Sequence, residues 1–301
     1  MASENQKKAM RARRFASDKS GKTAPSNGNW RTNRPPHNKN DADFEEKLVG
    51  TCEQLEKCYL RLTAPAKDTE VRPRHVLVKS LARVNELWAT KGEYNTCSEL
   101  LKSIRQDLTV QGIRDELAVE VYETHARLAL QAQDAPELNV CQSMLKSLYN
   151  ESPSRHWPNK EEFTACRLLY YVYTKDLADL TLLVSEVLLS PTPLPKCLVH
   201  ALNVVKSWLL GNHHYLFKLY ATAPPLSSAA MGFFIRRERE FYFRVILKAY
   251  RPFVTVTFVK TELKFENESS ANEFLKELGH VVFNNSAQID CKATLENFNS
   301  K

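Results

Sequence analysis

Residues 101–149 read LKSIRQDLTVQGIRDELAVEVYETHARLALQAQDAPELNVCQSMLKSLY. Apolar or half-apolar side chains recur in this stretch at steps of three or four, at Ile113, Leu117, Val121, Thr124 and Leu128. Such spacing places them on one face of an α-helix of about five turns. The stretch therefore predicts a mainly helical protein, and its second half predicts a partner for this helix.

The predicted partner helix begins with a capping signal. Asp134 is followed by Glu137 three residues later, with Pro136 in the first turn. This is the spacing of a capping box, and proline is accepted in the first turn because its missing N–H would have no helical partner there. The apolar stripe that follows consists of Leu138, Cys141, Leu145, Leu148 and Tyr149. The two helices are predicted to pack as an antiparallel pair.

The same helical pair recurs along the chain. The further predicted pairs are residues 77–92 with 94–108, 163–173 with 177–189, and 198–210 with 214–220. The first helices begin near residues 75, 113, 162 and 197, a spacing within the range of helical-repeat solenoids such as the TPR type. Asn159 with Glu162 is interpreted as a second cap. Each pair alone leaves an apolar face open, so the pairs are expected to stack into a solenoid over residues 41–222.

Composition agrees with a helical fold and excludes several classes of protein. The chain has only 8 Gly in 301 residues, which disfavours the glycine-rich α/β nucleotide folds. Its 7 Cys contain no C-x-x-C pair, so neither a disulfide framework nor a metal cluster is expected, and the compartment is expected to be reducing. Without a long apolar run or a signal-peptide core, we expect no membrane span and no secretory route.

The positive charge of the chain is concentrated in residues 1–40. That segment holds ten Lys or Arg against two acidic residues, a net of +8, whereas the rest has 32 against 33, a net of −1. It is rich in Ser, Asn, Pro and Gly, which predicts a disordered basic tail. Its densest cluster is Lys7, Lys8, Arg11, Arg13 and Arg14. This cluster indicates nuclear import or phosphate contacts, and the alternative is a merely solvated tail.

After residue 222 the pattern changes. A long helix is predicted over residues 227–251, then a strand at 253–258, helices at 260–265 and 269–278, and strands at 281–283 and 289–291. This order is typical of a winged helix. A solenoid that ends in a winged helix, here over residues 223–301, is the layout of a PCI domain.

The long helix is a candidate nucleic-acid surface, because residues 235–251 carry six cations and two carboxylates, a net of +4. The candidate cations are Arg236, Arg237, Arg239, Arg244, Lys248 and Arg251. Arg237, Arg244 and Lys248 share a helical face and are predicted to form a stripe for an RNA backbone, with Phe241 as a stacking surface. The alternative is that the aromatic residues belong to the core and the charges only solvate the other side.

The helix that would read DNA in a winged helix is acidic here, so we expect no DNA reading. The C-terminal region is instead expected to pair with another subunit. The candidate contact residues are Glu273, Glu277, Val281 and Phe283. The edge strand at 281–283 offers main-chain groups for such pairing.

Catalytic motifs are missing, so no enzymatic activity and no cofactor are expected. His125 and Glu123 lie two residues apart on a helix and therefore point to different faces, which favours a buried, hydrogen-bonded histidine over a general base. His213 and His214 lack an evident third metal ligand, so a packing or capping role is favoured.

Five blocks of sequence carry a family resemblance. They are residues 49–63 with 71–73, 103–113, 121–130, 139–149, and a series of segments from 168 to 259. On these blocks the chain resembles the SAC/GANP family of PCI-domain proteins, in the branch of the yeast THP splicing and elongation factor and the mammalian leukocyte-receptor-cluster protein. The resemblance implies a nuclear protein of mRNA biogenesis that pairs with a second PCI-domain subunit and with the small acidic Sem/Dss protein.

Two functional hypotheses remain open from the sequence. In the first, the chain is an RNA-binding adaptor in transcription-coupled splicing, elongation or export. In the second, it is a pure assembly scaffold, like the PCI subunits of the proteasome lid or the signalosome, and its charges serve import and solubility only.

Deleting residues 1–40 tests the role of the tail. Because a disordered segment contributes no buried surface, the melting temperature should be nearly unchanged, whereas nuclear accumulation of a fluorescent fusion should fall. A large drop in melting temperature, or unaltered nuclear accumulation, contradicts this prediction.

Overall fold

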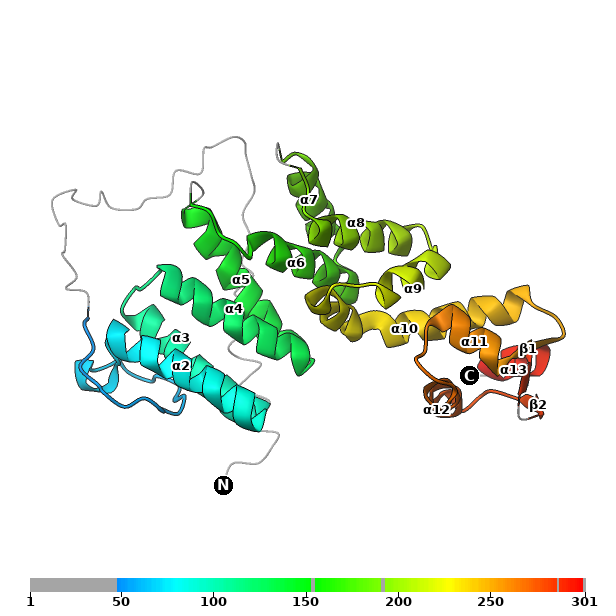
Figure 1. Cartoon of the computed structure of the whole chain (residues 1–301), viewed down its shortest axis with the longest axis horizontal. Helices are drawn as coiled ribbons and strands as arrows, with labels where there is room; N and C mark the ends of the chain where they lie inside the picture. Colours follow the sequence, from blue (N-terminus) through cyan, green and yellow to red (C-terminus); the bar gives the residue numbers. More distant parts are fainter. Residues whose placement is uncertain (1–47, 153–154, 191–192, 286, 300–301) are drawn as a thin grey trace, which may run out of the picture. The chain divides into compact units, whose positions relative to one another are not determined.

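The computed structural model describes residues 48–152, 155–190, 193–285 and 287–299, so the predicted tail lies outside the described residues. Within these ranges the protein is mainly α-helical, with a small sheet near the C-terminus (Figure 1). A 3₁₀ turn, η1 (Asp68–Glu70), precedes the helices α2 (Arg74–Lys91), α3 (Tyr94–Val110), α4 (Glu116–Gln131), α5 (Ala135–Glu151), α6 (Lys160–Thr174), α7 (Leu177–Leu188), α8 (Lys196–Leu209), α9 (His213–Ala221) and α10 (Pro225–Ala249). The predicted helical pairs are therefore present.

The ends of these helices follow from local chemistry. Gly92 ends α2 as predicted, with a φ of +64° and its N–H bonded to the Trp88 carbonyl. The start predicted at Ile113 is wrong. The Asp115 side chain accepts from the N–H groups of Leu117 and Ala118, so α4 begins at Glu116.

The two predicted capping signals have different outcomes. Asp134 caps α5 as predicted, because its Oδ1 accepts from the Glu137 N–H at 3.0 Å. Glu137 does not return the bond, because its carboxylate pairs with Arg105 at 2.5 Å. The Asn159 side chain does not cap α6 and instead donates to Glu123 at 2.6 Å. The side chains of Glu137 and Asn159 thus bind residues distant in the sequence and do not cap their own helices.

The segment before α2, residues 48–73, is called the strap here. A buried ion pair anchors it on α3. Arg72 and Asp107 are 0% and 1% exposed, with Arg72 Nε 2.6 Å from Asp107 Oδ2. The other guanidinium nitrogens of Arg72 donate to the Ser103 hydroxyl at 2.8 Å and to the Leu55 carbonyl at 3.1 Å. Lys57 adds a second cation, 2.8 Å from Asp107 Oδ1. The pair is well supplied with hydrogen bonds, which a buried ion pair needs to be tolerated.

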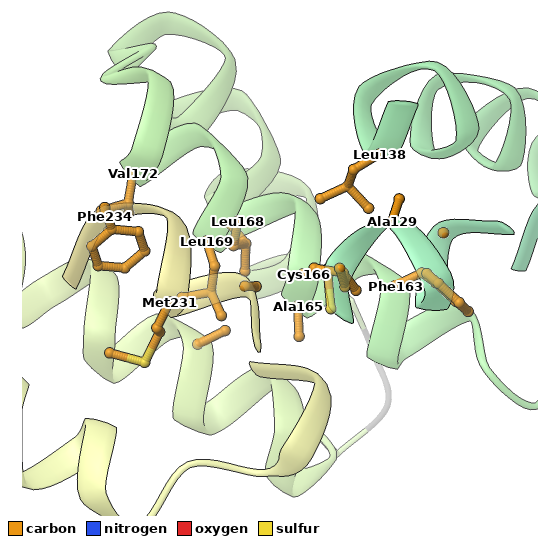
Figure 2. Packing of buried hydrophobic residues seen from close by; sticks show 14 of the residues in the cluster. Ala129, Leu138, Phe163, Ala165, Cys166, Leu168, Leu169, Val172, Met231 and Phe234 are labelled. Carbon is orange, nitrogen blue, oxygen red and sulfur yellow. The ribbon is translucent and has the colours of Figure 1, made fainter. Parts of the chain in front are cut away.

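The core of the helical region is built around α6. This helix packs more extensively on α8 than on its sequence neighbour α7, and α10 covers another of its faces. Figure 2 shows Met231 and Phe234 of α10 beside Leu169 and Val172 of α6, all of them buried. The helix α10 also contacts α4, so it packs on helices from two of the pairs.

The C-terminal region has the predicted order of elements with shifted boundaries. It consists of β1 (Phe253–Thr255), α11 (Val256–Leu263), α12 (Glu268–Leu278), β2 (Phe283–Asn285), β3 (Gln288–Asp290) and α13 (Cys291–Asn299), the last of which was not predicted. The sheet is antiparallel, in the order β1-β3-β2, and Val254 pairs with Ile289. The strand predicted to continue to Phe258 is wrong, because the Thr255 hydroxyl accepts from the Phe258 N–H and starts α11.

No helix in the described ranges is both long enough and apolar enough to cross a membrane. The predicted domain boundary at residue 222 stays a prediction. The helix α10 packs on α6, which precedes residue 222, and also on α11 and α13, which follow it.

Replacing Arg72 with Met should destabilise the protein by about 3 kcal/mol, because Asp107 then stays buried without its main partner. Denaturant unfolding measures the effect. The matched control is Arg83→Met, which breaks a pair with Glu56 whose side chains are about half exposed and should change the unfolding free energy by less than about 1 kcal/mol. Equal effects of the two substitutions would show that the strap is not anchored by this pair.

Candidate nucleic-acid and partner interfaces

Arg237 is turned toward α6 and away from the predicted stripe. Its Nη1 and Nη2 donate to the carbonyls of Tyr173 and Val172, at 2.8 and 3.0 Å, and its Nε donates to Glu238. These carbonyls belong to the last turn of α6, where they lack partners within the helix. Arg237 thus caps α6 and does not join Arg244 and Lys248, which corrects the predicted three-cation stripe.

Arg239 makes the equivalent contact on the other side of α10. It donates to the carbonyls of Leu263 and Lys264 at the end of α11, at 3.0 and 2.9 Å. The guanidinium lies 3.9 Å from the ring centroid of Phe265. Burial lowers the pKa of Arg239, although this side chain remains a cation at neutral pH. Arg239 therefore holds the C-terminal region on α10 and is not free for phosphate.

Arg236 links α10 to the acidic helix α12. Its Nη1 lies 2.9 Å from Glu277, and its Nε lies 3.5 Å from Glu240. The Arg236 and Glu277 side chains are 63% and 55% exposed, so the pair contributes little to stability. The pair joins Arg236, which was predicted to bind RNA, with Glu277, which was predicted to contact a partner protein.

The remaining cations of α10 lie on its C-terminal half. Arg244 is exposed and lies 4.9 Å from the Phe298 ring centroid, and Arg251 donates to the carbonyls of Leu247 and Tyr250. Lys248 is exposed and has no ionic or hydrogen-bond partner among the described residues. Arg244 and Lys248, four residues apart, are thus the cations of this helix best placed to meet a phosphate.

Phe241 is 56% exposed on the same helix, one turn before Arg244, and its ring lies 5.0 Å from that of His213. The prediction that it offers a stacking surface stays open, and its exposure permits that role. Lys7, Lys8, Arg11, Arg13 and Arg14 lie outside the described residues.

The predicted partner residues lie on α12 and at the sheet edge. Glu273 is exposed and accepts from the Ser269 hydroxyl at 3.2 Å. Phe283 is 38% exposed on the edge strand β2. Val281 is half-buried and precedes that strand, because the register of β2 begins at Phe283. Their role in pairing stays a prediction.

The paired histidines at the start of α9 are engaged in packing. His213 is buried, with Nδ1 donating to the Gly211 carbonyl at 2.9 Å and Nε2 3.3 Å from Glu238. Burial opposes ionisation of Glu238, but the bonds from His213 and Arg237 outweigh it and lower the pKa of this carboxyl. His214 pairs with Glu262 at 2.7 Å, which connects α9 with α11. The packing role favoured from the sequence is consistent with this geometry.

His125 is fully buried and lies 3.2 Å from the Ser98 hydroxyl, whereas Glu123 accepts from Tyr149 and Asn159. The two side chains therefore have separate partners, as expected. Burial, together with Arg105 and Lys102, lowers the pKa of His125 to about 3. Because the ring is neutral, its 4.0 Å approach to Glu137 is not an ion pair.

His125, Glu137 and Cys141 form the one group of metal-ligand type among the described residues, with one ligand atom of each within 4.8 Å of the others. Arg105 already supplies a cation there, because it pairs with Glu137 and donates to Cys141 Sγ at 3.2 Å. Burial raises the pKa of the Cys141 thiol to about 12, so the thiolate that a metal needs is disfavoured. The guanidinium explains the group without a metal.

The comparisons with known proteins agree with this architecture. The SAC3/GANP family profile matches residues 42–284, so the chain belongs to the SAC3/GANP family, as its sequence blocks predicted. It is 44% identical over 265 residues to the leukocyte receptor cluster member 8 homolog of Xenopus laevis, covering 87% of this chain and 33% of that protein.

Two fungal relatives extend the comparison. The chain is 37% identical over 235 residues to a THP3 homolog of Schizosaccharomyces pombe, covering 78% of this chain and 58% of that protein. It is 30% identical over 295 residues to Protein THP3 of Saccharomyces cerevisiae, covering 93% of this chain and 61% of that protein. The chain thus spans 33% to 61% of the length of these three relatives.

Below about pH 6.5, the unfolded chain protonates His125 while the folded protein leaves it neutral. Stability should therefore fall as the pH is lowered from 7 to 4.5, with a contribution from this residue of up to about 1.4 kcal/mol per pH unit. Denaturant unfolding of His125→Gln should show a correspondingly shallower pH dependence. The exposed His156→Gln should keep the parent's slope, and identical slopes for all three proteins would rule out a buried neutral histidine.

Proposed function

We propose that this protein is a nuclear, non-enzymatic PCI-domain adaptor in mRNA biogenesis that binds RNA and pairs with a second PCI-domain subunit. The observation that carries the proposal is the SAC3/GANP match over residues 42–284, which covers the helical pairs, α10, β1, α11 and α12 and ends within β2. The relatives named THP3 and leukocyte receptor cluster member 8 support a role in mRNA biogenesis rather than in the proteasome lid.

The order of elements supports the PCI assignment. Helical pairs precede α10, and then come β1, α11, α12, β2 and β3, which is the order helix, strand, helix, helix, strand, strand of a winged helix. We interpret α2 to α9 as the solenoid part. The acidic α12 occupies the place of a recognition helix, so protein pairing is a better role for it than DNA reading.

The polar interior supports an adaptor rather than an enzyme. His125, His213 and Glu123 are buried and held by structural partners. A general base needs access to a substrate proton, which these side chains lack. The small acidic Sem/Dss-type protein belongs to the proposed complex on family grounds.

The scaffold alternative has one observation in its favour. Arg236, Arg237 and Arg239 are used within the protein, so the net charge of α10 overstates the basic surface that it offers. If the exposed pair Arg244 and Lys248 and the tail do not bind RNA, the chain is an assembly scaffold.

RNA binding by α10 is tested with Arg244→Glu combined with Lys248→Glu, in a chain that lacks residues 1–40 so that the basic tail cannot mask the loss. Binding of a single-stranded oligonucleotide should weaken with little sequence preference, and the dependence of log affinity on log salt should become shallower by about 0.7 per lost phosphate contact. Fluorescence anisotropy at several salt concentrations gives both values.

The control for the RNA experiment is Lys79→Glu combined with Lys91→Glu, two exposed lysines on α2 that make the same change in net charge. If the chain is an RNA-binding adaptor, this control should retain the parent's affinity for the oligonucleotide. Equal weakening in the two double variants, or none in either, supports the scaffold alternative.

Partner pairing is tested with Glu273→Arg combined with Glu277→Arg. Both side chains are exposed, so the fold should be retained, and co-purification of the second PCI-domain subunit should fall because the pairing surface reverses its charge. Glu53→Arg combined with Glu120→Arg makes the same charge change elsewhere. Undiminished recovery of the partner with the α12 variant would exclude this surface.

A further inference from the structure

A groove runs between α5 and α6 and is also lined by residues of α7 and α8. It consists of two adjoining hollows of about 260 and 270 Å³ that share Gln142 and Arg167. Its lining follows α5 from Asn139 to Asn150, which corresponds to about 16 Å of helix. Since an extended chain advances about 3.3 Å per residue, the groove has the length of about five residues of extended peptide.

Hydrogen-bond donors lie where the two hollows meet. Gln142 is 2% exposed, and its Nε2 has no hydrogen-bond partner among the residues that the structure describes. Arg167 is half-buried beside it and shares a hydrogen bond with the Tyr171 side chain, and burial lowers the pKa of its guanidinium. A buried donor without an acceptor is unfavourable, so a ligand that brings an acceptor to this point is stabilised.

The hollow that Lys146 and Lys160 line favours an anion. It lies at the first turns of α6 and α8, and the residue before each helix, Asn159 or Pro195, makes no side-chain hydrogen bond that caps its N-terminus. Free N–H groups at helix N-termini stabilise negative charge. The ionic side chains that line it are Lys146, Lys160 and Arg167 against Glu161 and Glu186, so the cations are in excess by one.

The side chains that line the groove indicate which kind of molecule carries the anion. The hollow that Lys146 lines has apolar walls that suit aliphatic side chains, formed by Leu145, Phe163, Leu183, Val187 and Leu198. Asp176 and Asp179 line the other hollow, where they attract the N–H donors that a peptide backbone carries and a phosphate lacks. This combination fits a polypeptide better than a nucleic-acid backbone.

We propose that the groove between α5 and α6 binds an extended segment of a partner protein, with an Asp or Glu side chain at Gln142 and Arg167 and an aliphatic residue beside it. The inference rests on the proposed role as a subunit of a complex. It uses a surface different from the exposed cations of α10 and from α12.

The test is to select binders of the full chain from a display library of random eight-residue peptides and to measure their affinity by fluorescence anisotropy. Selected peptides should place Asp or Glu next to Leu, Ile, Val or Phe. They should bind Gln142→Leu and Lys146→Glu about tenfold more weakly than the parent, because each substitution removes a donor or cation from the groove. The exposed Lys79→Glu is the matched control.

Gln142→Leu should unfold at the same temperature as the parent or higher, since it replaces an unpartnered buried donor with a side chain of similar volume, so weaker binding cannot be ascribed to unfolding. The inference is overturned if no peptide is selected, if the peptides lack a carboxylate, or if Gln142→Leu binds them as the control does. Displacement of the peptides by polyuridylate would assign the groove to RNA instead. RNA binding through Arg244 and Lys248 is measured separately, so it can fail or hold independently.

Discussion

Two arginines on α10 join the helical pairs to the C-terminal sheet region. Arg237 donates to the carbonyls of Tyr173 and Val172 at the end of α6, and Arg239 donates to the carbonyls at the end of α11. The last carbonyls of a helix have no partner within it and carry partial negative charge, so a planar guanidinium satisfies two of them at once. Buried Met231 and Phe234 add apolar packing on the α6 side (Figure 2). On the C-terminal side, the His214–Glu262 pair and the packing of α13 on α10 add to the contacts of Arg239.

The helices could be predicted from the sequence because their signals are local. Periodicity located every helix from α2 to α10, and Gly92 and Asp134 marked ends that the structure retains. The boundaries that failed depended on a single side chain, such as the cap by Asp115 that delays α4. The helix α13 was missed because it begins directly after β3, at Cys291, where the strand predicted at 289–291 still continued.

The candidate site could be predicted only in part. A sequence shows which side chains are charged, but it does not show which distant groups these side chains bind in the folded protein. The carbonyls that Arg237 meets lie 64 and 65 residues earlier in the chain, and the cluster of Arg72 with Asp107 spans 35. Nothing in the spacing of α10 separates these cations from Arg244 or Lys248. The groove at Gln142 is likewise lined by residues from Asn139 to Leu198, which no local motif connects.

The most direct measurement is the unfolding free energy of Arg237→Gln beside that of Arg244→Gln, together with the RNA affinity of both. We expect Arg237→Gln to lose about 1.5–3 kcal/mol, as for hydrogen bonds that involve a charged group, and to retain its RNA affinity. Arg244→Gln should lose less than about 1 kcal/mol and should weaken RNA binding. A stable Arg237→Gln protein with weakened RNA binding would contradict the account, because Arg237 would then face RNA and not α6.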